Sequence, residues 1–184
     1  MDINKLSFLF IIGILILASM NDLLYKKIPN WLTFSSLLFG IIFQSLFRGY
    51  DGFIFSLQGI GVGFVIPFVI YLAGGFGAGD VKLMAAIGSF VGPKEIFIIF
   101  IFSSLLSGTW AIILLSIHGF IFHTLKRYYN ILITLFFTRR LIYIPPLSGE
   151  KKLRIRFGIM VTLATFFTEL YGNILPLNTL FFRL

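Results

Sequence analysis

Long apolar runs alternate with short polar breaks along most of this chain. Six runs are separated by charged residues, glycines or prolines, at residues 6–24, 31–47, 53–73, 80–91, 95–122 and 157–175. A helix of about 20 apolar residues crosses the hydrocarbon core of a bilayer, and most of these runs match or approach that length. The pattern predicts an all-α polytopic membrane protein, with six transmembrane helices in one bundle and a single domain over residues 1–184.

Composition supports a membrane protein and excludes several kinds of site. The chain is 58% hydrophobic, whereas soluble domains are roughly 45–50% apolar. It has no cysteine, which excludes disulfides, a thiolate nucleophile and a cysteine zinc site. The two histidines, His118 and His123, have the wrong spacing to share a helical face, so we expect no metal and no cofactor. The first run is read as a retained span, because no cleavage site for a signal peptide stands out.

The distribution of lysine and arginine indicates a topology. Eleven of the 15 basic residues fall on one side of the predicted spans, including Lys26, Lys27 and Lys82. The positive-inside bias places that side in the cytoplasm and both termini outside. The net charge of +8 is therefore a topology signal, and we expect no nucleic-acid partner. The basic segment 125–156 predicts an interfacial amphipathic stretch and a loop, which could meet anionic lipids or a secretion partner.

The positions of two acidic residues make them candidates for a catalytic role. Asp80 follows the glycine-rich stretch 74–79 and opens the fourth run, and Asp22 ends the first run. An ionisable residue in or beside a bilayer is costly and is therefore a functional candidate. Ala18 and Ser19, one helical turn before Asp22, are small enough to admit a neighbouring helix. The inferred topology puts both aspartates at cytoplasmic helix ends, where two helix ends at one depth can bring them together.

A pair of close carboxylates holds one proton between its members, because both cannot ionise cheaply. Such a pair hydrolyses peptides without a metal or a covalent intermediate. The plainer interpretation is that Asp80 caps a helix N-terminus and that Asp22 is a solvated charge at a helix end. Position alone leaves both interpretations open. Asn30 is likewise placed to cap the second helix.

Two motifs resemble the signature of type IV prepilin peptidases. Residues 77–88 read GAGDVKLMAAIG and resemble the family's GxGD motif, and Asp22 followed by Lys27-Ile28-Pro29-Asn30 resembles its other half. The order, the separation and the six-span layout also match. The resemblance implies an integral aspartic endopeptidase of the plasma (inner) membrane with Asp22 and Asp80 as its catalytic pair. Its substrates would be prepilins or pseudopilins, cleaved at the cytoplasmic face, with pilus or secretion machinery as further partners.

The chain departs from the larger members of that family. Those enzymes carry an N-terminal domain with paired Cys-x-x-Cys motifs and methylate the new N-terminus. This chain resembles the short, peptidase-only form associated with tight-adherence pili, so we expect leader removal without N-methylation. The family's last span usually opens with a proline-containing turn. Here Arg156-Phe157-Gly158-Ile159 stands in that place without a proline.

Three further residues are candidates for supporting the pair. Gly77 and Gly79 would bring Asp80 to Asp22 and leave room for an extended substrate backbone. Lys82 would bias the pair toward ionisation or hold substrate carbonyls, or it is a lysine that snorkels at a helix end. The alternatives in function are a related GxGD peptidase, of preflagellin or intramembrane type, and a small transporter or assembly factor with the glycine-broken helix as its binding site.

Overall fold

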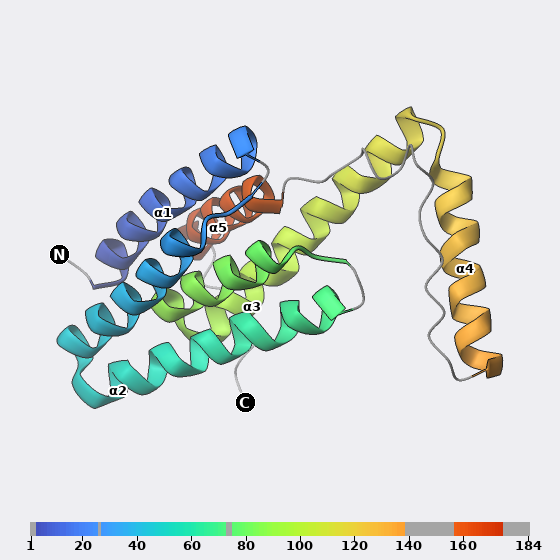
Figure 1. The fold of residues 1–184 in the computed structure, drawn as a ribbon. Helices are drawn as coiled ribbons and strands as arrows, with labels where there is room; N and C mark the ends of the chain where they lie inside the picture. Colours follow the sequence, from blue (N-terminus) through green and yellow to red (C-terminus); the bar gives the residue numbers. More distant parts are fainter. Residues whose placement is uncertain (1–2, 26, 73–74, 139–156, 175–184) are drawn as a thin grey trace. The chain divides into compact units, whose positions relative to one another are not determined.

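The computed structural model describes residues 3–25, 27–72, 75–138 and 157–174. These residues form helices and turns, without a strand among them, which confirms the all-α prediction for this part of the chain. The helices, in order, are α1 (Ile3–Tyr25), α2 (Asn30–Leu72), α3 (Ala78–Ile117), α4 (Ile121–Thr138) and α5 (Phe157–Ile174) (Figure 1). The chain divides into two compact units, Met1–Leu105 with Arg156–Leu184, and Leu106–Ile155. Each unit is described by itself.

Helix α2 is a hairpin of two helical halves that reverses at Gly49. Its 43 residues would measure about 64 Å if straight, at about 1.5 Å per residue, which is twice the roughly 30 Å core of a bilayer. Gly49 takes φ 61° and ψ −139°, a conformation that glycine adopts at little cost. Figure 1 shows the two halves running back along each other, and Ser56 Oγ lies 3.4 Å from the carbonyl oxygen of Gly40 between them. The reversal falls in the polar break that the sequence places after residue 47.

Helix α3 breaks in the same way at Gly92, where φ is 80° and the next residue is Pro93. Proline has no N–H and its ring crowds the carbonyl four residues earlier, so a helix ends before it. The fourth apolar run was expected to end at this point, at residue 91. In Figure 1 the two halves of α3 meet at this reversal. Because Pro93 has no N–H, the carbonyl group of Ser89 lacks its usual helical donor.

Helix α2 supplies side-chain donors to the carbonyl groups of Ser89 and Phe90, just before the break. The Ser56 hydroxyl donates to the carbonyl oxygen of Ser89 at 2.7 Å, and the Gln44 side-chain amide donates to that of Phe90. Both donor side chains are buried, at 0% and 1% exposure. A buried carbonyl without a partner is costly, especially inside a bilayer. These two bonds therefore explain how a helix can end within the apolar interior.

Replacing Gln44 by leucine is expected to destabilise the first unit by about 1–2 kcal/mol, since one buried carbonyl loses its donor. The measurement is the thermal unfolding midpoint in detergent. Gln58 is the matched control, because it lies in the same helix and is exposed. Equal midpoints for Gln44→Leu and Gln58→Leu would contradict the capping role.

Helices α2 and α3 approach each other through glycines. A Cβ atom built on Gly59 would overlap the carbonyl oxygen of Gly88, and one built on Gly88 would overlap that of Gly59. A Cβ on Gly63 would lie 2.5 Å from the carbonyl oxygen of Met84, whereas Gly61 has nothing within 4 Å. Small residues let helix backbones come close where lipid supplies no hydrophobic driving force. The glycine face of the third apolar run is thus a packing surface at Gly59 and Gly63.

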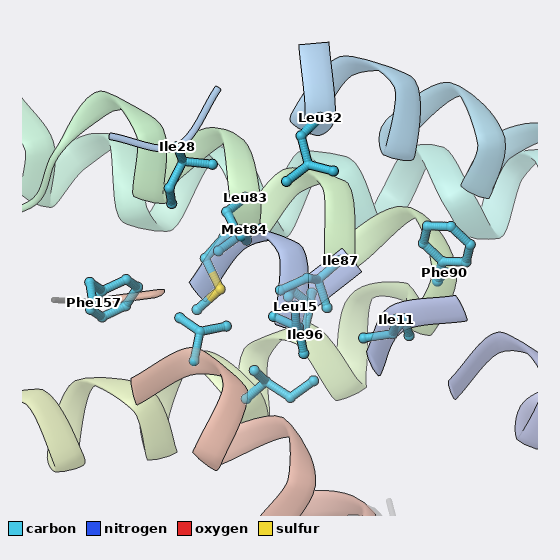
Figure 2. Close-up of a cluster of buried hydrophobic side chains, with 13 residues drawn as sticks. Ile11, Leu15, Ile28, Leu32, Leu83, Met84, Ile87, Phe90, Ile96 and Phe157 are labelled. Carbon is cyan, nitrogen blue, oxygen red and sulfur yellow. The ribbon is translucent and has the colours of Figure 1, made fainter. Parts of the chain in front are cut away.

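The core of the first unit joins α1, α2, α3 and α5. Thirteen buried side chains form it, among them Ile11, Leu15, Met84, Ile87 and Phe90 (Figure 2). Helix α1 also meets α5 through a hydrogen bond of 2.7 Å between the hydroxyls of Ser19 and Thr162. Ala18 is fully buried. The small residues before Asp22 therefore do admit a neighbouring helix, and that helix is α5.

Three helices are long and apolar enough to cross a membrane, with candidate spans at Leu6–Tyr25, Asn30–Leu72 and Ala78–Ile117. Phe157–Thr168 is a shorter apolar helix. Large apolar side chains on the long helices are widely exposed, Leu24 at 70% and Leu46 at 78% among them. In water this surface would be unfavourable, whereas lipid tails match it. The chain is an integral membrane protein.

In the second unit, α3 ends at Ile117 by a Schellman motif. Gly119 has φ 72°, the Phe120 N–H donates to the carbonyl oxygen of Leu115 at 2.9 Å, and the Gly119 N–H to that of Ser116 at 3.2 Å. The helix ends here, before the end expected for the fifth apolar run at residue 122. Helix α4 then exposes large apolar side chains at helical spacing: Phe122, Leu125, Tyr129, Ile133 and Phe137. The rest of the predicted interfacial segment, 139–156, lies outside the described residues, as does residue 175.

Candidate active site

Asp80 sits in the first turn of α3 and is held by the loop before it. The Asp80 N–H donates to the carbonyl oxygen of Gly77 at 3.0 Å, and the Gly77 N–H donates back to Asp80 Oδ2 at 3.0 Å. The second bond is one half of a capping box, in which the side chain of the third helical residue accepts from the N–H of the residue that precedes the helix, here Gly77. The plainer interpretation of Asp80 as a cap is therefore realised. The hydrogen bond from the Gly77 N–H also fixes the orientation of the Asp80 carboxylate.

The motif glycines lie where the packing is tight. Positive φ occurs at Gly49, Gly92 and Gly119 among the described glycines, so Gly77 and Gly79 do not adopt left-handed backbone. A Cβ on Gly77 would lie 3.1 Å from Asp80 Oδ2, and one on Gly79 would lie 3.3 Å from Ile28 Cβ. Any larger residue would crowd either the carboxylate or the turn before α2.

Asp22 lies in the last turns of α1 and faces the start of α5. Its Oδ2 atom is buried, and a Cβ built on Gly158 would lie 3.3 Å from that atom. The Ser19 hydroxyl, one turn earlier, lies 3.4 Å from the carbonyl oxygen of Gly158. Sequence reasoning left Gly158 without a role. Its fit against the Asp22 carboxylate is a tertiary contact over more than 130 residues, which no local pattern signals.

Two contacts link the segment that carries Asp80 to the surroundings of Asp22. The rings of Phe76 and Phe157 lie 4.4 Å apart between centroids, and Phe157 adjoins Gly158. Gly79 packs against Ile28, which is buried in the turn after α1. Figure 2 shows Ile28 and Phe157 at one end of the core, opposite Ile11 and Phe90.

Figure 1 shows that the end of α1 and the starts of α2, α3 and α5 gather at this end of the first unit. The structure therefore brings both aspartate-bearing helix ends to one side of the bundle.

Lys82 contacts the other half of the predicted signature. Its Nζ donates to Asn30 Oδ1 at 2.9 Å and lies 5.6 Å from the centroid of the Phe34 ring. Asn30 was expected to cap α2, but the Thr33 N–H donates to the carbonyl oxygen of Pro29 at 3.4 Å. Pro29 therefore holds the capping position and Asn30 is the first helical residue. The capping prediction was wrong because the proline already provides the turn, and the Asn30 amide oxygen accepts from Lys82.

One comparison with known proteins identifies the family of this chain. The model of the type IV leader peptidase family matches residues 9–112, more than half of the chain. The matched region contains Asp22, the glycine loop and Asp80. Neither the curated proteins nor the solved structures contain a match. The chain belongs to the type IV leader peptidase family and is an aspartic peptidase.

Proposed function

We propose that this protein removes the leader peptide from type IV pilin-like precursors at the cytoplasmic face of the membrane, with Asp22 and Asp80 as its catalytic pair. One observation carries the proposal beyond family membership. The segment before Asp80 packs on Phe157, which adjoins Gly158 beside Asp22, and on Ile28, which lies in the turn after α1. Two carboxylates gathered at one end of an apolar bundle have the chemistry of an aspartic peptidase.

The proposed reaction needs one proton shared by the pair. The ionised carboxylate takes a proton from a water molecule, whose oxygen attacks the scissile carbonyl carbon, while the protonated carboxylate donates a hydrogen bond to the carbonyl oxygen. The tetrahedral intermediate then releases the amine, which takes a proton from the pair, as the C–N bond breaks. The products are the leader with a new carboxylate and the mature pilin with a new amine. Apparent pKa values of this reaction belong to the pair.

The loop geometry suits this chemistry. The bond from the Gly77 N–H to Oδ2 orients the Asp80 carboxylate before substrate arrives. Gly77 places no side chain beside that oxygen, which gives an extended substrate backbone room to approach, whereas Gly79 packs on Ile28. The apolar helix of the precursor would enter from the bilayer, with its basic leader in the cytoplasm.

The proposed topology has six crossings: α1, the two halves of α2, the two halves of α3, and α5. The reversals at Gly49 and Gly92 support this count, because each divides a long helix into two pieces. Lys27 and Lys82 lie at the aspartate end of the first unit, whereas Arg48 lies beside the reversal of α2. The positive-inside bias then places the aspartates toward the cytoplasm and both termini outside.

The test is co-expression with a type IV pilin precursor, followed by mass measurement of the product. We expect the precursor to lose its leader and the new N-terminal amine to remain unmethylated. A precursor that stays intact beside correctly inserted protein contradicts the proposed function. A methylated product contradicts the peptidase-only interpretation alone.

A further inference from the structure

Lys82 and Asn30 join two segments that lie far apart in the sequence. The ammonium of Lys82 donates to Asn30 Oδ1 at 2.9 Å, across 52 residues, and also lies over the Phe34 ring at 5.6 Å from its centroid. Lys82 follows Asp80 by two residues, and Asn30 follows Asp22 by eight. The bond therefore connects the second turn of α3 to the first residue of α2, close to both aspartates in the chain.

A second contact reinforces this connection. Gly79 packs so closely on Ile28 that a Cβ atom would lie 3.3 Å from Ile28 Cβ. Ile28 is buried and belongs to the core. The apolar contact thus holds the turn between α1 and α2 to the start of α3, and the hydrogen bond and the cation–π contact hold the start of α2 to the same segment. Because few residues separate this turn from Asp22, its position limits where the end of α1 can lie relative to Asp80.

We infer that the Lys82–Asn30 bond is a positioning tether that sets the separation of the two catalytic aspartates. This inference rests on the proposed function. A hydrogen bond at an exposed helix end adds little to global stability. A misplacement of about 1 Å at a catalytic centre, in contrast, can cost on the order of 100-fold in rate. The tether therefore acts on the rate of the chemical step, and Lys82 serves it by binding Asn30 rather than substrate.

The kinetic test compares Lys82→Met, Asn30→Ala and the double variant in the full-length protein, with a prepilin as substrate. Each single variant is expected to lower kcat about 10- to 100-fold with KM changed less than about 3-fold. The kcat of the double variant should be no lower than that of the less active single variant, because both substitutions remove the same bond. Asn30→Asp should retain activity, since a carboxylate also accepts from the ammonium. Lys27→Met, which removes an exposed charge beside Ile28, is the matched control.

Three results of these measurements would overturn the tether. The first is a Lys82→Met variant with raised KM beside a fully active Asn30→Ala variant, which would mean that Lys82 meets substrate directly. The second is losses that multiply in the double variant. The third is that both single variants lower the thermal unfolding midpoint equally while kcat per folded molecule is unchanged.

A second readout does not need cleavage and keeps the tether testable if the proposed function fails. The chain has no cysteine, so Ile28→Cys with Gly79→Cys introduces the only thiol pair. The Cβ separation of 3.3 Å is close to the roughly 3.5–4.5 Å of a disulfide. We expect oxidative cross-linking of this pair to slow several-fold when Lys82→Met is added and to be unchanged when Lys27→Met is added. Equal rates in both backgrounds contradict the tether.

Discussion

Replacing Asp22 or Asp80 by asparagine, each alone, is expected to lower leader removal by at least about 10³-fold. General acid–base groups contribute about 10²–10⁴-fold each, and the two carboxylates share one proton, so neither replaces the other. Asparagine keeps the shape of aspartate but cannot ionise or carry the shared proton. The measurement is the rate of leader removal from a co-expressed prepilin, normalised to inserted protein.

Asparagine also separates the catalytic role of Asp80 from its capping role. The Asp80 carboxylate accepts from the Gly77 N–H at 3.0 Å, and the side-chain oxygen of asparagine can accept the same bond. The start of α3 should therefore survive in Asp80→Asn, so lost activity reports on chemistry. Asp51→Asn is the matched control, because Asp51 is an exposed aspartate at the start of the second half of α2. Cleavage that persists in Asp22→Asn or Asp80→Asn would eliminate the paired mechanism.

Replacing Gly88 by alanine is expected to unfold or severely destabilise the first unit. The new Cβ atom would meet the carbonyl oxygen of Gly59 on the facing helix, and neither backbone can rotate away as a side chain could. Overpacking typically costs about 1–3 kcal/mol, and occasionally more; contact with backbone places this case at or above the upper end. Gly59→Ala should behave in the same way, because its Cβ atom would meet the carbonyl oxygen of Gly88.

The control for this second prediction is Gly61→Ala. Gly61 lies in α2 between the packing glycines Gly59 and Gly63, yet nothing lies within 4 Å of its Cβ position. Alanine there should be neutral or stabilise the helix by up to about 1 kcal/mol. Thermal unfolding in detergent and limited proteolysis give the comparison. Matching midpoints for Gly88→Ala and Gly61→Ala would show that the two helices pack less closely than the structure has them.

The sequence predicts much of the local structure because its causes are local. An apolar run in a chain without strand signals becomes a helix, and Gly92-Pro93 ends one because proline lacks the N–H that the helix needs. The glycine loop before Asp80 and the turn at Ile28-Pro29 can be recognised for the same reason. The end of α3 at Ile117 was placed too late, because Gly119 was not recognised as the residue that closes it.

Tertiary contacts decide the features that depend on which helices become neighbours. Nothing in the local sequence around Gln44 and Ser56 indicates that their side chains donate hydrogen bonds to carbonyl groups of α3. The role of Gly158 follows only from its contact with Asp22, and that of Lys82 only from its hydrogen bond to Asn30. Each of these pairs joins residues at least 30 positions apart, so the bond depends on the final packing of the bundle.

The sequence by itself determined that this protein is helical and membrane-embedded, that its long helices reverse near Gly49 and at Gly92, and which two aspartates and which glycine loop carry the family's motifs. These properties follow from hydrophobicity, backbone chemistry and residue type within a few turns. The tertiary structure alone decided how α1, α3 and α5 surround the aspartates, and which distant side chains hold them. The reason is that close packing of glycine faces selects one set of neighbours, and hydrogen bonds over long sequence separations form only once that packing exists.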